Sequence, residues 1–202
     1  MKILVVKYLP SGEKSNTKKV LDLFLKEVKS HEIEELDLLK NPAPIFDEES
    51  IQSYYKRNYG GKELDEKEAN LLAKNDKLIA QLKACDLLVL ASPMHNFNFP
   101  AAIKAYLDAV IFNGETFEPG KKLMAGRKAL VLYTSGGMYA EDKFNLEYPN
   151  WDAITFNAKV NFNFMGFDES EVIGTSLREK AEEKLEKVKE KIQKTLSKWK
   201  ID

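Results

Sequence analysis

Short runs of apolar residues alternate along this chain with longer stretches whose apolar residues recur every three or four positions. The runs have the length of strands, and the longer stretches have the spacing of helices that bury one face. Such an alternation predicts a parallel sheet covered by helices on both faces. The runs expected as strands are residues 3–6, 33–39, 87–91, 129–133 and 171–174, of which 33–39 alternates with acidic residues and suits an edge. The stretches expected as helices are 16–29, 71–82, 103–111, 151–165 and 181–196.

Residues 41–62 lack a regular apolar spacing and are expected to be the least ordered part of the fold. Asn41-Pro42 opens this stretch and Gly60-Gly61 closes it. The chain has 202 residues, which one hydrophobic core can organise, so a single domain over 1–202 is expected.

Charge and cysteine content exclude several functions. The 31 basic and 32 acidic side chains leave a net charge of -1, which gives no electrostatic reason to expect nucleic acid or an anionic membrane as partner. Cys85 is the single cysteine, so an intrachain disulfide and a cluster of thiolate metal ligands are both excluded, and no metal is expected. No apolar run is long enough for a signal-peptide core or a membrane span, which predicts a cytoplasmic protein.

Ligands of a doubly wound sheet bind beyond the carboxyl ends of its strands, so three loops need inspection. The first, residues 8–17, opens directly into a helix and carries Ser11, Ser15, Asn16 and Thr17. Hydroxyls and free N–H groups at a helix start favour a phosphate monoester. Ser15 serving only as a helix cap explains the same residues equally well. The glycine patterns of nucleotide-binding P-loops and dinucleotide folds are absent.

The third loop holds Pro93, Met94, His95, Asn96 and Phe97 between a buried strand and a helix start. Flat apolar groups with a few donors and acceptors suit a planar ligand with polar edges, such as an isoalloxazine ring. A well-packed turn is the alternative, although a core turn rarely needs amides and a histidine.

The fourth loop offers glycines where a strand ends. Ser135, Gly136 and Gly137 would let backbone N–H groups approach a ligand closely, because no side chain obstructs them. An ordinary tight turn would have the same composition.

With these loops in order, the sequence resembles the FMN-dependent NAD(P)H azoreductase and quinone reductase family of the flavodoxin-like fold. The stretch 92–97 resembles the family's Pro-Met-aromatic-Asn-Phe flavin loop, and 15–17 resembles its hydroxyl-x-hydroxyl phosphate motif. The stretch 123–129, followed by 135–137, resembles the segment that reaches the pyrimidine edge of the flavin.

The resemblance implies a five-stranded sheet in the order 2-1-3-4-5 and FMN as cofactor. It also implies ping-pong turnover, in which NADH or NADPH delivers two electrons that pass to a quinone, azo or nitro compound. A homodimer with the partner chain partly covering each flavin is implied as well. Two departures, His95 in an aromatic position and a short stretch at 116–128, put the choice of acceptor in doubt.

Individual roles follow from this resemblance. Asn96 is expected at the polar edge of the ring, and His95 is a candidate donor of a hydrogen bond or proton. A surface or interface histidine that fills the family's aromatic position is the alternative. Phe117 and Phe162 are candidates for the acceptor pocket, and core packing explains them as well. A one-electron flavodoxin carrier and a cofactor-free binding domain are the competing functions.

Overall fold

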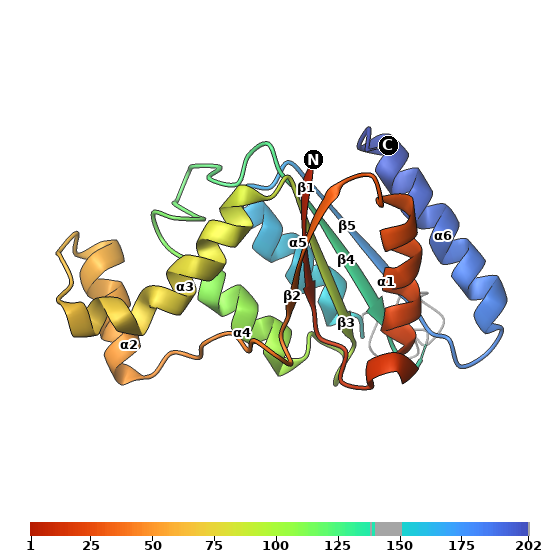
Figure 1. Ribbon diagram of the computed structural model, residues 1–202, viewed down its shortest axis with the longest axis horizontal. Coiled ribbons are helices and arrows are strands. Elements are labelled where there is room, and N and C mark those ends of the chain that lie inside the picture. The colour runs from red at the N-terminus through yellow and green to blue at the C-terminus, as the bar shows by residue number, and fades with distance from the viewer. Residues whose placement is uncertain (138, 140–150, 202) are drawn as a thin grey trace.

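Five parallel strands form one sheet in the order β2-β1-β3-β4-β5 (Figure 1), which confirms the predicted doubly wound α/β fold. The computed structural model describes residues 1–137, 139 and 151–201. The strands are β1 (Lys2–Lys7), β2 (Glu32–Asp37), β3 (Leu87–Pro93), β4 (Lys128–Thr134) and β5 (Glu169–Thr175). The main helices are α1 (Asn16–Glu27), α2 (Glu48–Tyr54), α3 (Glu66–Ala84), α4 (Ala101–Val110), α5 (Ala153–Met165) and α6 (Ala181–Lys198).

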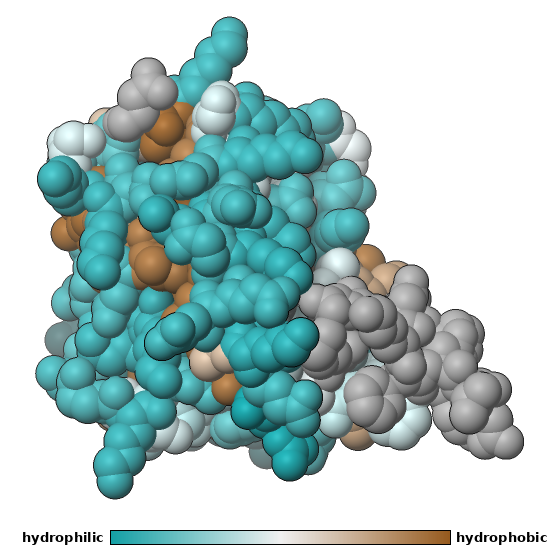
Figure 2. Space-filling model, turned by 90° about the vertical axis from the view of Figure 1, so that its right-hand side faces the viewer, coloured by the Kyte–Doolittle hydropathy of each residue, from teal (hydrophilic) through white to brown (hydrophobic). Residues whose placement is uncertain are grey.

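The sheet separates two apolar layers. In β1, Ile3 and Val5 face α1 and α6, whereas Leu4 and Val6 face α3 and α4, and all four side chains are fully buried. Strands buried on both faces read as continuous apolar runs, which is the pattern in the sequence. Figure 1 shows α1 and α6 on one side of the sheet and α3, α4 and α5 on the other. The outer side of α1 and α6 is largely hydrophilic (Figure 2).

Residues 41–62 differ from the expectation, because they contain α2 and a π-helical turn, η2 (Tyr55–Tyr59). The Asp47 carboxylate accepts a hydrogen bond from Ser50 N–H at 2.9 Å, and the Ser50 hydroxyl oxygen accepts one from Asp47 N–H, so a capping box starts α2. The buried face of this short helix is Ser50, Ser53 and Tyr54. Apolar periodicity therefore could not reveal the helix.

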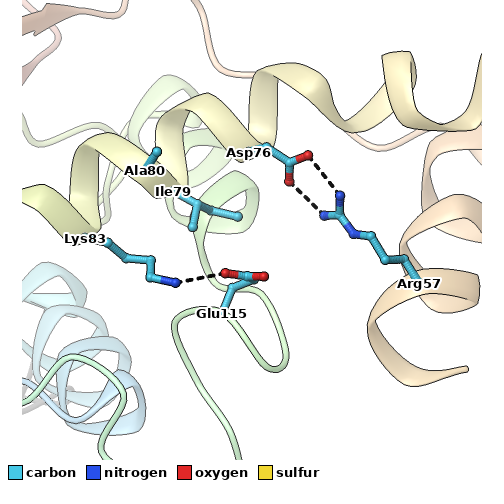
Figure 3. A pocket seen from close by; sticks show the side chains of 6 residues that line it. All are labelled: Arg57, Asp76, Ile79, Ala80, Lys83 and Glu115. Atoms are coloured by element: carbon cyan, nitrogen blue, oxygen red, sulfur yellow. Dashed lines mark hydrogen bonds and ion pairs between the residues drawn. The ribbon is translucent and has the colours of Figure 1, made fainter. Parts of the chain in front are cut away.

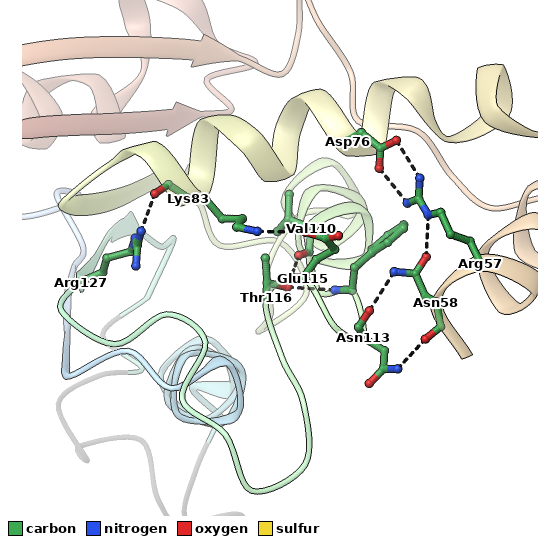
Figure 4. A network of polar contacts seen from close by, with 10 residues as sticks. Arg57, Asn58, Asp76, Lys83, Val110, Asn113, Glu115, Thr116 and Arg127 are labelled. Carbon is green, nitrogen blue, oxygen red and sulfur yellow. Dashed lines mark hydrogen bonds and ion pairs between the residues drawn. The ribbon is translucent and has the colours of Figure 1, made fainter. Parts of the chain in front are cut away.

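A network of amide contacts holds η2 against the loop after α4 (Figure 4). Asn58 Nδ2 donates to the carbonyl of Asn113 at 2.8 Å, and Asn113 Nδ2 donates to the carbonyl of Asn58 at 2.9 Å. The guanidinium of Arg57 binds both carboxylate oxygens of Asp76, on α3, at 2.9 and 2.8 Å. These polar contacts fix the segment 48–59 together with the buried ring of Tyr54, whose centroid lies 4.4 Å from that of Phe112.

Most other boundaries lie within two residues of the expected ones, and α3 begins at Glu66, five residues before the expected start at 71. The second strand ends at Asp37 rather than at residue 39, because Lys40 N–H turns back to the carbonyl of Asp37. The first helix ends at Glu27 rather than at residue 29.

Candidate functional site

The loops that follow β1, β3, β4 and β5 are tied together at the carboxyl edge of the sheet. Tyr8 N–H donates to the carbonyl of Ala91 at 2.9 Å, which joins the first loop to β3. Met94 N–H donates to the carbonyl of Thr134 at 2.7 Å, and Ser135 N–H donates to that of Thr175 at 2.9 Å. The three loops singled out in the sequence therefore meet at one edge.

The first loop uses its hydroxyls differently from the expectation. Ser15 caps α1, because its Oγ accepts a hydrogen bond from Lys18 N–H at 3.3 Å. Thr17 is fully buried, and its Oγ1 lies 2.7 Å from Oγ1 of Thr134, at the end of β4. The Thr17 side chain thus points into the fold and not toward a ligand, while Ser11 and Asn16 remain exposed.

The start of α1 is electrostatically suited to an anion. Its first turn contains no acidic residue and includes Lys18 and Lys19, of which Lys18 pairs with Asp22 at 2.9 Å and with Glu13 at 3.6 Å. The first N–H groups of a helix have no acceptor inside the helix and point outward with the positive end of the helix dipole. The start of α4 is also free of acidic residues. The carboxylate of Asp152 caps α5, and α2, α3 and α6 carry acidic residues in their first turns.

The third loop is a tight turn in a left-handed conformation. His95 and Asn98 exchange two backbone hydrogen bonds, both at 3.0 Å, and φ is +47° at Asn96 and +67° at Phe97. Positive φ at both central residues is the feature of a type I′ turn, which favours Asn and Gly. Phe97 is a bulky residue in a conformation that costs about 1–3 kcal/mol, and such strain concentrates where a ligand is held.

Helix α5 supports this turn. Ala153 N–H donates to the carbonyl of Phe97 at 3.0 Å, and Asn157 Nδ2 donates to Oδ1 of Asn98 at 3.0 Å. The ring of Phe97 stands edge-on to the rings of Trp151 and Tyr139, with centroid distances of 4.7 and 5.2 Å. Neither Phe97 nor Trp151 is fully covered, so the turn presents an aromatic surface.

His95 is exposed beside this surface, and its ring meets that of Tyr8 edge-on at 6.1 Å. It therefore lies where the third loop meets the first.

The fourth loop is open to an approaching ligand at one of its two glycines. A Cβ at Gly136 would meet no atom within 4 Å, whereas one at Gly137 would lie 2.8 Å from the ring of Tyr139. The Ser135 hydroxyl donates to the carbonyl of Gly137 and closes the loop.

The two phenylalanines expected in an acceptor pocket do not join this cluster. Phe162 is 1% exposed and packs in the core against Phe167, so its ring cannot touch a ligand from within this chain. Phe117 is half-buried against Phe164, with ring centroids 4.5 Å apart. Both lie near the end of α5 at Met165, whereas the cluster lies at its start, Ala153.

Sequence reasoning missed the contacts of Thr134 and the hydrogen bond between the side chains of Asn98 and Asn157. Thr134 and Tyr8 belong to the loops that were singled out, but nothing in their types showed that they bridge loops. Asn98 and Asn157 are 59 residues apart, and no local signal pairs them.

A shallow groove elsewhere on the surface is lined by the residues shown in Figure 3: Arg57, Asp76, Ile79, Ala80, Lys83 and Glu115. Its charges are already paired, Arg57 with Asp76 and Lys83 with Glu115 at 3.0 Å. None of these residues belongs to the loops at the carboxyl edge. Across the described ranges 1–137, 139 and 151–201, no three His, Cys, Asp or Glu side chains gather as metal ligands would.

The chain is similar to known proteins over most of its length. A family model for the flavodoxin-like fold matches residues 1–196. A protein of Psychromonas ingrahamii named FMN-dependent NADH:quinone oxidoreductase is 34% identical over 168 residues, which cover 80% of this chain and 76% of that protein. A protein of the same name from Cronobacter sakazakii is 30% identical over 190 residues, covering 90% of this chain and 92% of that protein.

Solved structures agree with these relatives. The crystal structure of an FMN-dependent NADH-azoreductase from Bacillus anthracis in complex with FMN has a TM-score of 0.85 and 25% identity, and the match covers 100% of both chains. An azoreductase structure from another strain of Bacillus anthracis has a TM-score of 0.82 and 27% identity, covering 98% of this chain and 99% of that one.

Proposed function

We infer that this chain, which belongs to the flavodoxin-like fold family, is an FMN-dependent NADH oxidoreductase of the quinone reductase and azoreductase type. The family match spans nearly the whole chain. The two oxidoreductases named above are 34% and 30% identical to it in sequence, and the two azoreductase structures have its fold. One observation supports the position of the site. Thr134 contacts both Thr17 and Met94, so the first, third and fourth loops meet at one place.

The residues at this edge fit FMN. The phosphate end of the cofactor needs N–H donors, and the first turn of α1, which contains no acidic residue, provides them beside Ser15 and Asn16. The ring end needs an apolar surface and backbone donors, which Phe97 and the open Gly136 provide. We propose that Ser11, Ser15 and Asn16 hold the phosphate and that residues 93–97 and 135–137 hold the ring.

Bound FMN supplies hydride chemistry, taking two electrons from NADH and giving them to an acceptor. The chain itself orients the ring by means of the turn 95–98, whose backbone α5 holds at Phe97 and Asn98. The N–H groups of Gly136 and Gly137 would stabilise negative charge at the adjacent ring edge. We propose that His95, which is exposed, donates a proton to the acceptor.

We propose that the acceptor is a small planar molecule such as a quinone, azo or nitro compound. The aromatic surface of Phe97 and Trp151 is open, so a flat acceptor has room to stack beside it after the donor leaves. This sequence of events is the ping-pong scheme that the resemblance implies. A His95→Phe variant tests the proton donor: normal turnover across the pH range would exclude that role.

We also propose that the chain works as a homodimer. Three exposed apolar residues follow one another on α5 at intervals of four: Phe156 is 69% exposed, Val160 49% and Phe164 50%. Residues four apart share one helix face, so they form a stripe that begins beside the turn 95–98. A second copy packed on this stripe would lie next to the site. Val160→Glu should then convert a dimer to a monomer in size-exclusion chromatography, and a monomeric wild type would refute the proposal.

We also propose that the protein is cytoplasmic and that residues 1–202 form a single functional domain. In the part of the chain that the structure describes, no helix is both long and apolar enough to cross a membrane.

Spectroscopy tests the central proposal. The purified protein is mixed with FMN, and its visible absorption is followed during anaerobic addition of NADH. Stoichiometric binding followed by bleaching in a single two-electron phase is the expected result. Bleaching in two separate phases would favour a one-electron carrier, and failure to bind FMN would favour a binding domain.

A further inference from the structure

The side chain of Thr134 joins the two ends of the candidate site. Its hydroxyl lies 2.7 Å from that of Thr17 in a contact that is buried on both sides, with Thr17 at 0% and Thr134 at 7% exposure. Thr17 is the second residue of α1, whereas Thr134 is the last residue of β4. The contact therefore connects the helix start proposed for the phosphate with the loop proposed for the ring.

The same residue holds the ring side through its backbone. The carbonyl of Thr134 accepts the hydrogen bond from Met94 N–H at 2.7 Å, which fixes the start of the turn-bearing loop. The backbone contact does not depend on the Thr134 side chain. Removing the hydroxyl would therefore remove the tie to the helix start, while the backbone contact that holds the loop carrying Phe97 would remain.

We propose that Thr134 is a positioning residue that acts through Thr17 to set the spacing between the phosphate end and the ring end of the bound flavin. The inference rests on the proposed function, because it concerns how this site holds FMN. A ligand that contacts both ends depends on their spacing, whereas a ligand that contacts only the ring end does not. FMN and riboflavin form such a pair, since they share the ring and differ in the phosphate.

The variants are chosen to separate spacing from stability. Thr134→Val alone leaves the buried Thr17 hydroxyl without a partner, which destabilises the fold. The double variant Thr17→Val/Thr134→Val replaces both hydroxyls by methyl groups of the same shape, so it removes the tie without leaving an unpaired polar atom. Thr134→Ser keeps the hydroxyl, and Thr175→Val removes a hydroxyl from the neighbouring position on β5.

Apoprotein of each variant is titrated with FMN and with riboflavin, and thermal unfolding of the apoprotein is recorded. The double valine variant should unfold near the wild-type temperature, lose about tenfold in FMN affinity and keep its riboflavin affinity. Thr134→Ser and Thr175→Val should keep the wild-type ratio of the two affinities. If the ratio of FMN affinity to riboflavin affinity is unchanged in the double variant, the inference is overturned and the proposed function stays intact. A wild type that binds neither flavin would instead refute the proposed function.

Discussion

The ring of Tyr133 on β4 lies directly across Gly174 on β5, so that a Cβ at Gly174 would come within 2.1 Å of Tyr133 Cζ. Tyr133 is fully buried. The glycine is therefore required by the tyrosine on the neighbouring strand.

Gly174→Ala should lower the free energy of unfolding by about 2 kcal/mol, because overpacking a buried site costs about 1–3 kcal/mol. Urea unfolding measures the change. In a Tyr133→Leu background the same substitution should cost much less, since the obstructing ring is gone. Equal costs in the two backgrounds would show that the contact with Tyr133 is not the cause.

Gly136→Ala should leave stability nearly unchanged and weaken FMN binding. A Cβ at this position meets nothing in the fold, so surface-like substitution effects within about 0.5 kcal/mol are expected. A ligand that approaches the Gly136 backbone would meet the added methyl group. Unfolding and flavin titration of the same sample distinguish the two effects, and unaltered FMN affinity would remove Gly136 from the site.

Two variants of Asn96 distinguish a role in the turn from a contact with the ligand. Its φ of +47° should make Asn96→Ala destabilising by about 1 kcal/mol, whereas Asn96→Gly should be tolerated. If the amide of Asn96 contacts the ring, both variants should bind FMN more weakly. Normal binding by the glycine variant would assign Asn96 to the turn alone.

Burial raises the pKa of the Cys85 thiol from its ordinary value of 9.0 to about 11. The folded state then keeps the proton that the unfolded chain releases above pH 9, so this contribution to stability is complete below pH 9 and is lost as the pH rises toward 11. Between pH 8 and pH 10 the wild type should lose about 1 kcal/mol more than Cys85→Ala. Parallel pH profiles of the two proteins would contradict the shift. At neutral pH the native thiol should react slowly with thiol reagents.

Asn58→Ala should loosen the segment 48–59 without unfolding the sheet. The substitution removes the donor to the Asn113 carbonyl and the acceptor for Arg57 Nε, and it leaves the packing of the core untouched. Hydrogen exchange in α2 and η2 should accelerate by about tenfold or more, because these two hydrogen bonds are lost. Asn70→Ala, on the exposed surface of α3, is the matched control. Acceleration spread over the strands as well would indicate a global effect.

The sequence predicts the sheet well because its strands are buried on both faces and its helices on one. β1 and β3 are continuous apolar runs, and α1 repeats its apolar residues every turn. α2 escapes this reasoning, since its buried side chains are two serines and a tyrosine and its start is fixed by Asp47.

The candidate site was predictable as a set of loops and less so as individual side chains. Residue types locate an anion site at the start of α1, but they do not tell which way a hydroxyl points, and Thr17 turns inward to a residue 117 positions away. Phe97 adopts a conformation that its own type disfavours, because α5 and neighbouring rings hold it there. Phe162 illustrates the reverse error, in which an aromatic residue suited to a pocket is used by the core.

The distance in sequence between Thr17 and Thr134 also matters while the chain is being made. A ribosome that has released α1 has still to synthesise more than half of the protein before β4 can reach that helix. The turn at Phe97 waits even longer, because its support at Ala153 follows β4. A nascent chain that ends before β4 thus carries the first loop without the groups that fix it, so we expect the cofactor to bind only after α5 has been synthesised.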